Sequence, residues 1–142
     1  MLAHLDLTDR VIGLAIEVHK NLGPGLLESV YEACLAFELK RAGVQFRRQA
    51  PMPIVYRGFH LDTGFRADLL VAEGLIVEIK AVDRLVLAHE AQILTYLRMS
   101  GCPVGLLLNF NAVLLKDGLR RFVRSRRTLS SVLVDVPIDD DR

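Results

Sequence analysis

The stretch that decides the fold of this 142-residue chain covers residues 65–82 and reads FRADLLVAEGLIVEIKAV. Apolar residues alternate along it with charged or small ones at a period of two, which is typical of half-buried β-strands. A turn at Ala72-Glu73-Gly74 divides the stretch. We therefore predict two short strands joined by a tight turn and carrying Asp68, Glu78 and Lys80.

The length of this turn fixes which side chains share a face, because a slip of one residue moves every side chain of a strand to the other face. A two-residue loop, Glu73-Gly74, would turn Asp68 away from Glu78. A three-residue loop, with Gly74 in the left-handed conformation, places Asp68 directly opposite Glu78. We predict the three-residue loop because it sorts the side chains by polarity. One face then carries Phe65, Ala67, Leu69, Val71, Leu75, Val77 and Ile79, and the other carries Arg66, Asp68, Glu78 and Lys80.

Composition indicates one globular domain, which we place at residues 1–127, with a loosely held tail at residues 128–142. Hydrophobic residues make up 51% of the chain and charged residues 25%, and the net charge of +1 implies no particular partner. Cys34 and Cys102 lack metal-binding spacing, so we expect a reduced, cytoplasmic protein without zinc. No signal peptide and no apolar run of roughly 18 residues is present, so we expect no membrane association.

The rest of the sequence predicts an α/β fold, a mixed sheet flanked by helices. We expect a first helix capped by Thr8 or Asp6, and an edge strand or connector at Pro51 and Pro53. The first predicted helix ends near residue 22, and the other two cover about residues 26–41 and 85–100. The predicted strands cover 44–49, a hairpin at 54–61, a buried strand at 104–110 and a terminal hairpin at 113–123.

Asp68, Glu78 and Lys80 are candidates for chemistry. If the register is right, the two carboxyl side chains lie roughly 5 Å apart at Cβ. Two carboxylates this close repel each other unless a cation lies between them, and Mg²⁺ prefers such oxygen ligands. Lys80 would then hold the attacking water or offset phosphate charge. The alternative is a solvated sheet face, with Arg66 and Lys80 paired to the two acids.

Two residues of the predicted third helix could complete such a site. Gln92 and Tyr96 lie one turn apart on one helix face and would want polar partners if buried. The alternative is an exposed glutamine and a core tyrosine. Glu28, in the first turn of the second helix, suits the positive helix end, and we expect Glu32, one turn later, to be solvated.

GLLESVY at residues 25–31 is a full GxxExxY pattern, and FRADLLV, IVEIKAV, HEAQILTYLR and GLLLNF follow in order. These separated motifs resemble those of the bacterial GxxExxY proteins, a branch of the PD-(D/E)XK nuclease superfamily, and the resemblance covers roughly residues 8–124. Ala67 stands where the superfamily name has proline. The resemblance implies a restriction-endonuclease-like core, a central mixed sheet with helices on both sides.

The resemblance also implies a site and an activity. Asp68 matches the first acidic residue, Glu78 and Lys80 match the E-x-K pair, and Glu28 matches the helix glutamate near the metal. The metal, Mg²⁺ or Mn²⁺, would be bound by Asp68, Glu78, the Ile79 carbonyl and Glu28. Gln92 and Tyr96 resemble the QxxxY motif of exonuclease-like branches. We therefore expect a metal-dependent nuclease of low sequence specificity, or a catalytically silent binding module on the same fold.

The expected partner is a nucleic acid, DNA rather than RNA. Arginines that could contact phosphates are Arg120, Arg121 and Arg124, continuing to Arg126 and Arg127, and a second group with Arg47 and Arg48. The alternative is a solvated strand end and tail. We find no helix-turn-helix, zinc finger or aromatic stacking platform. The oligomeric state stays open, although a second subunit is one way for so small a chain to clasp a duplex.

Overall fold

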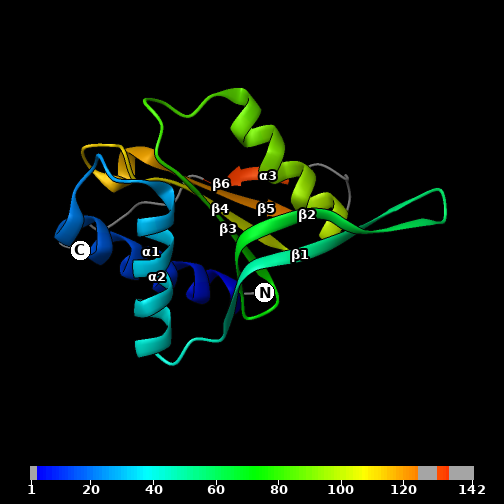
Figure 1. Ribbon diagram of the computed structural model, residues 1–142, viewed down its shortest axis with the longest axis horizontal. Helices are drawn as coiled ribbons and strands as arrows, with labels where there is room; N and C mark the ends of the chain where they lie inside the picture. The colour runs from blue at the N-terminus through cyan, green and yellow to red at the C-terminus, as the bar shows by residue number, and fades with distance from the viewer. Residues whose placement is uncertain (1–2, 125–130, 135–142) are drawn as a thin grey trace.

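The computed structural model describes residues 3–124 and 131–134, which form a mixed α/β domain (Figure 1). Within these residues, two helices come first, three strands follow, and a third helix precedes the last three strands, in the order predicted for a sheet flanked by helices. The helices are α1 (Ala3–Leu22), α2 (Glu28–Arg41) and α3 (Leu87–Ser100), with a 3₁₀ turn, η1, at Leu115–Gly118. The strands are β1 (Phe46–Tyr56), β2 (Phe59–Val71), β3 (Leu75–Lys80), β4 (Val104–Asn109), β5 (Leu119–Arg124) and β6 (Ser131–Val134).

The strands form one sheet in the order β1-β2-β3-β4-β5-β6. All neighbours are antiparallel except β3 and β4, which are parallel and therefore need a crossover, supplied by α3. The carboxyl ends of β3 and β4 consequently meet at one edge, where Lys80 pairs with Asn109. The Asn109 side chain exchanges two hydrogen bonds with the Val82 backbone, at 3.0 and 2.9 Å, and so fixes the chain that leaves β3.

Helices cover both faces of the sheet, as predicted. Figure 1 shows the sheet nearly edge-on, with α3 on one side and α1 and α2 on the other. One apolar cluster packs under α1 and α2, and a second packs under α3 around Ile93 and Leu97. Every residue of β4 is buried, as expected for a strand covered on both faces. Among the described residues, no helix is both long enough and apolar enough to cross a bilayer.

The predicted register of β2 and β3 is confirmed, but the predicted turn conformation is wrong. Leu69 pairs with Val77 and Val71 with Leu75, which aligns Asp68 with Glu78. The left-handed residues are Ala72 (φ 50°) and Glu73 (φ 57°) rather than Gly74. The Gly74 amide donates to the Val71 carbonyl at 3.1 Å. Two successive residues with positive φ, enclosed by a hydrogen bond of this kind, define a type I′ turn, whose twist matches that of the two strands of a hairpin.

The predicted sorting of faces holds near the turn and fails further along β2. Leu69 packs under α1 and α2 as expected, whereas Ala67 and Phe65 pack with the cluster under α3. The change coincides with Gln49 on β1, whose φ is 47° and which is skipped in the pairing of the two strands. A left-handed residue inside a strand bends the ladder, so the strand pair turns toward α3 beyond this point.

Three other local predictions need correction. Helix α1 begins at Ala3, so Thr8 and Asp6 lie inside the helix and do not cap it. Residues 113–115 form no strand, because β5 pairs with the buried β4 instead of turning back on its own neighbour. Residues 131–134 add β6 to the sheet, which therefore continues past the domain end predicted at 127; the other residues of the predicted tail lie outside the described residues.

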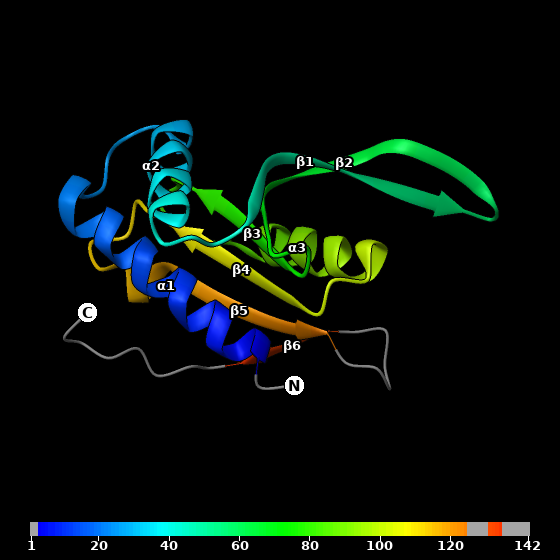
Figure 2. The ribbon, with the colours of Figure 1, turned by 90° about the horizontal axis from the view of Figure 1, so that it is seen from below.

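The predicted hairpin at residues 54–61 is the tip of a long two-stranded arm. Figures 1 and 2 show β1 and β2 extending together past the end of α3. Tyr56 and Phe59 pair across the tip and are 65% and 64% exposed. Two exposed aromatic side chains thus lie side by side at the arm's end.

Candidate active site

The candidate site lies where β2 and β3 diverge, on the sheet face that α3 covers. The backbone amide of Ile79 donates to Asp68 Oδ2 at 2.8 Å, and the backbone amide of Asp68 donates to Glu78 Oε1 at 3.2 Å. Backbone pairing of the two strands ends at Leu69 and Val77. Each carboxyl side chain therefore accepts a backbone N–H of the opposite strand, and both are held where the ladder opens.

Burial and repulsion by Asp68 raise the pKa of the Glu78 carboxyl group. Glu78 is only 4% exposed, and its pKa is raised from 4.5 to about 8. Burial, which disfavours the charged form, is the largest cause, and the neighbouring charge of Asp68 is the next. The Asp68 backbone N–H and the Lys80 ammonium act in the opposite direction. Glu78 therefore keeps its proton at neutral pH more readily than an exposed glutamate does.

Lys80 and the third helix form the other side of the site. The Lys80 ammonium donates to Gln92 Oε1 at 3.1 Å. The Tyr96 ring stacks on Phe65, with ring centroids 3.9 Å apart. The pKa of Tyr96 is raised by burial first and by the charge of Glu78 second, while Gln92 acts to lower it. The structure thus brings Asp68, Glu78, Lys80, Gln92 and Tyr96 together.

Two residues that the sequence did not single out border this group. The Gln49 side-chain amide donates to Glu32 Oε1 at 2.6 Å and to Asp68 Oδ1 at 3.2 Å. The prediction that Glu32 is solvated is wrong, because this side chain is 7% exposed and accepts two bonds from Arg48 at 3.2 and 3.0 Å. The α2 carboxylate connected to Asp68 is therefore that of Glu32.

Glu28 is the α2 carboxylate that was predicted to help bind the metal. It begins α2 and is exposed, and within the described residues no hydrogen bond or ion pair joins it to Asp68 or Glu78. The Ile79 side chain is buried in the cluster under α1 and α2, while its backbone N–H serves Asp68. Metal binding by Glu28 and by the Ile79 carbonyl stays a prediction.

The predicted phosphate-binding arginines divide between β1 and β5, with β2, β3 and β4 between them. Arg121 does not fit that role, because it is 4% exposed and donates to Thr8 Oγ1 at 2.6 Å and Asp9 Oδ1 at 3.3 Å in α1. Arg120 and Arg124 alternate with it and so lie on the α3 face, bonded to the Leu119 and Gly101 carbonyls. Arg126 and Arg127 lie outside the described residues.

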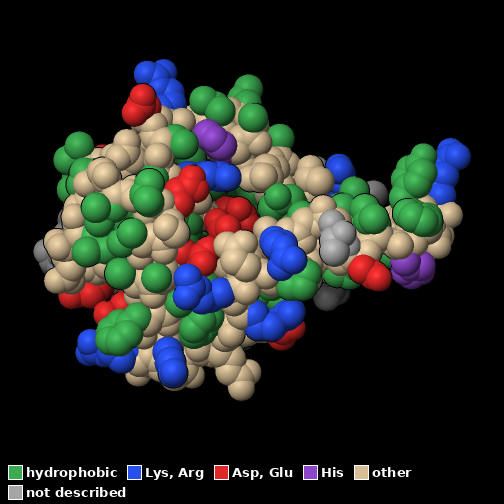
Figure 3. Space-filling model, in the orientation of Figure 1, with side chains coloured by type: hydrophobic (Ala, Val, Ile, Leu, Met, Phe, Trp, Pro, Cys, Tyr) green, Lys and Arg blue, Asp and Glu red, His purple; other side chains and the backbone are tan. Residues whose placement is uncertain are grey.

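The other arginine group is already paired with acids. Arg48 binds Glu32, and Arg47 binds Glu73 through two bonds of 3.0 Å. Figure 3 shows acidic side chains gathered in the middle of the face viewed there, with basic side chains around them. An acidic centre with a basic border suits a bound cation and a phosphate chain that passes over it.

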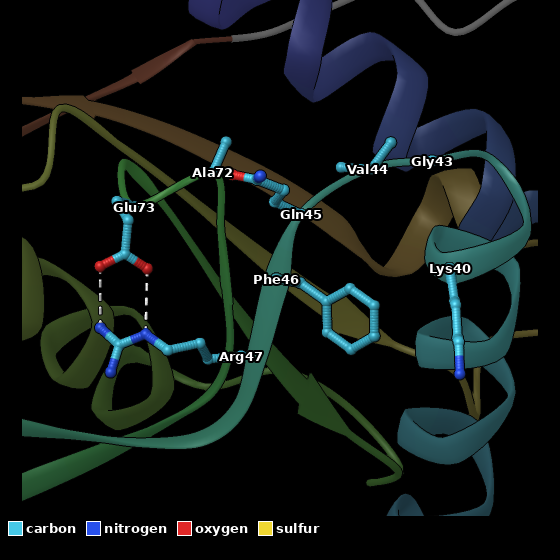
Figure 4. Close-up of a pocket in the computed structure, with 8 residues that line it drawn as sticks. All are labelled: Lys40, Gly43, Val44, Gln45, Phe46, Arg47, Ala72 and Glu73. Carbon is cyan, nitrogen blue, oxygen red and sulfur yellow. Dashed lines mark hydrogen bonds and ion pairs between the residues drawn. The ribbon is translucent and has the colours of Figure 1, made fainter.

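A cavity of about 490 Å³ lies beside the β2–β3 turn, and neither the acidic pair nor Lys80 lines it (Figure 4). In Figure 4, Arg47 and Glu73 face each other on one side, while Phe46 and Lys40 lie toward α2. The residues that line it are Lys40, Gly43, Val44, Gln45, Phe46, Arg47, Ala72 and Glu73. It borders the turn rather than the acidic pair, so we do not assign it to the candidate site.

The donor set suits a hard divalent cation. Asp68 and Glu78 are adjacent carboxyl groups, and after burial the charge of Asp68 is the next cause of the raised pKa of Glu78. A cation such as Mg²⁺ needs one or two carboxylates and keeps several waters. Within the described part of the chain, no three His, Cys, Asp or Glu side chains converge as a complete cage. Two adjacent carboxyl groups fit a cation that also binds water and substrate.

Comparison with known proteins places the chain in a family. Residues 5–122 match the sequence profile described as PD-(D/E)XK nuclease superfamily, which is most of the chain. The chain therefore belongs to the PD-(D/E)XK nuclease superfamily, and its mixed sheet with helices on both faces agrees with the restriction-endonuclease-like fold. A comparison with curated proteins found no match, and a comparison with solved structures found none either.

Proposed function

We propose that this member of the superfamily hydrolyses phosphodiester bonds of DNA, with little sequence specificity, and needs Mg²⁺ or Mn²⁺. The observation that carries the proposal is the reciprocal bonding of Asp68 and Glu78 beside Lys80. Bonds between carboxylates and backbone amides hold the acids together at the strand ends, with an ammonium group two residues further along the same strand. Surface ion pairs would leave the acids exposed, whereas Glu78 is buried.

Each residue has a distinct role in this proposal. Asp68 and Glu78 hold the divalent cation, with the Ile79 carbonyl and Glu28 as further candidates. When bound, the cation supplies Lewis-acid activation and charge neutralisation. Lys80 orients the attacking water and offsets the negative charge that develops on the phosphate. Gln92 accepts one of the three ammonium hydrogens of Lys80 and leaves the others to face substrate.

The remaining groups position the substrate and the lysine. Tyr96, stacked on Phe65, supports the α3 side of the site, where Gln92 lies one turn away. The exposed Arg66 side chain is anchored to the Gln49 carbonyl at 3.3 Å, next to Asp68 in β2. Contacts from Arg66, Arg120 and Arg124 to phosphate would give binding that depends on salt and not on sequence.

The proposal is tested by incubating labelled single- and double-stranded DNA and RNA with the protein in Mg²⁺, Mn²⁺ or EDTA. Lys80→Ala is compared with Lys40→Ala, which removes an exposed α2 lysine of equal charge away from the acids. We expect divalent-dependent cleavage by the wild type and by Lys40→Ala. For Lys80→Ala we expect cleavage to be roughly 100-fold slower or more, a typical effect of losing one group that stabilises the transition state.

The outcomes separate the nuclease from a silent binding module. Equal cleavage by wild type and Lys80→Ala would show a contaminating enzyme and refute the assignment of the site. Nucleic-acid binding by a wild type that cleaves nothing in either metal would favour the binding module. Cleavage of RNA alone would keep the chemistry and correct the substrate.

A further inference from the structure

Gln49 has a backbone conformation that is unusual for its position. It lies within β1, yet its φ is 47°, in the left-handed region that a residue with a side chain adopts only at an energetic cost. Such strain persists where the surrounding structure holds it in place, and it occurs often at functional sites. The consequence here is geometric. The left-handed turn interrupts the pairing with β2 beside Asp68 and directs the Gln49 side chain toward two carboxylates.

The Gln49 side chain links a carboxylate of α2 to a carboxylate of β2. Its one amide nitrogen donates to Glu32 Oε1 at 2.6 Å and to Asp68 Oδ1 at 3.2 Å, and an amide nitrogen has two hydrogens to give. Arg48 holds the other Glu32 oxygen. Glu32 is thereby fixed as an acceptor in α2, and its negative charge is balanced by Arg48.

Both oxygens of Asp68 are consequently fixed. Oδ2 accepts from the Ile79 backbone, and Oδ1 accepts from Gln49. The first bond sets where Asp68 lies along β3, and the second sets the rotation of its carboxylate plane. Outer groups of this kind orient a metal-binding side chain, and their loss typically weakens metal binding by 10- to 100-fold.

We propose that Gln49, held by Glu32, is a positioning residue that orients the Asp68 carboxylate for the divalent cation. This rests on the proposed function, since it assigns Asp68 to the cation. Gln49 itself does not touch the cation or the reacting atoms. Through Glu32 and Gln49, the position of α2 therefore influences the orientation of Asp68 on β2.

The test separates the side chain of Gln49 from its backbone. Gln49→Gly removes the amide and keeps the left-handed conformation without strain, whereas Gln49→Ala removes the same amide and keeps the strain. We expect Mn²⁺ affinity, measured by calorimetry or electron spin resonance, to fall roughly 10-fold in both variants. The urea midpoint in EDTA should be higher for Gln49→Gly than for Gln49→Ala. Unchanged or tighter Mn²⁺ binding in Gln49→Gly would overturn the proposal, and tighter binding would show that the amide competes with the cation.

A second measurement needs no metal. The side-chain amide signal of Gln49 in a ¹H–¹⁵N spectrum of the metal-free protein is identified by its loss in Gln49→Gly. We expect this signal to shift in both Glu32→Gln and Asp68→Asn, because each changes an acceptor of the amide. If it has the shift of a free glutamine and responds to neither change, the proposal is refuted. If the Gln49 amide signal responds but wild type binds no Mn²⁺, Gln49 joins Glu32 to Asp68 without orienting Asp68 for a cation. The metal-binding function then fails, and with it the assignment of Gln49 to that cation.

Discussion

Replacing Glu78 with glutamine should make the protein's stability less dependent on pH. The pKa of Glu78 is raised from 4.5 to about 8 in the folded protein, chiefly because the side chain is buried. Between these pH values the folded state holds a proton that the unfolded chain has released. Folded protein therefore binds more protons than unfolded protein, and the free energy of unfolding falls as the pH rises through this window.

The magnitude follows from the distance between the two pKa values. A rise from 4.5 to about 8 is a difference of about 3.5, and at about 1.4 kcal/mol for each pKa unit it corresponds to roughly 5 kcal/mol. Glutamine at 78 has no proton to lose, and its Oε1 can still accept from the Asp68 backbone. The free energy of unfolding of Glu78→Gln, minus that of wild type, should thus grow from pH 4.5 to pH 8 by up to about 5 kcal/mol.

Urea unfolding in EDTA, followed by circular dichroism at pH 5, 6, 7, 8 and 9, measures this difference directly. Glu73→Gln is the matched control, because Glu73 is exposed and pairs with Arg47 at the turn. Its difference from wild type should stay within about 1 kcal/mol across the series, as expected for an exposed ion pair. A Glu78→Gln difference that is as flat as that of Glu73→Gln would refute the raised pKa. It would also show that Glu78 reaches solvent.

Three further outcomes follow from the same structure. Mn²⁺ affinity should rise by up to about tenfold per pH unit and level off above about pH 8, since the cation displaces the Glu78 proton; calorimetry measures this. Arg121→Met should lower the free energy of unfolding by about 1–3 kcal/mol through loss of the buried bond to Thr8, and filter binding should show unchanged nucleic-acid affinity. Gly105→Ala should cost about 1–3 kcal/mol in urea unfolding, because its Cβ would lie 2.9 Å from Ile93 Cδ1 of α3.

The register of the β2–β3 hairpin could be predicted because a local rule decided it. Side chains alternate across a strand, so the pattern of apolar residues alone selected the pairing that aligns Asp68 with Glu78. The conformation of the turn was not fixed in the same way. Glycine is the residue that most readily adopts positive φ, yet the hydrogen bond from Gly74 to Val71 places Ala72 and Glu73 there instead.

The second helix shows why the sequence missed part of the site. Glu28 and Glu32 are one turn apart, and their local patterns cannot tell which of them meets another element. In the structure, Gln49 and Arg48 of β1 bind the buried Glu32, whereas Glu28 is exposed. A glutamine within a strand, followed by two edge prolines, carried no visible signal that its backbone would be left-handed.

Arg121 shows the same principle from the other side of the sheet. Arg120, Arg121 and Arg124 form one cationic run in sequence, but alternation places Arg121 on the opposite face from the buried Phe122. That face is covered by α1, from a part of the chain more than one hundred residues away. Charge therefore did not show which arginine is available to phosphate. Strand alternation shows that Arg121 faces away from Arg120 and Arg124. Only the placement of α1 decides that Arg121 is the buried one.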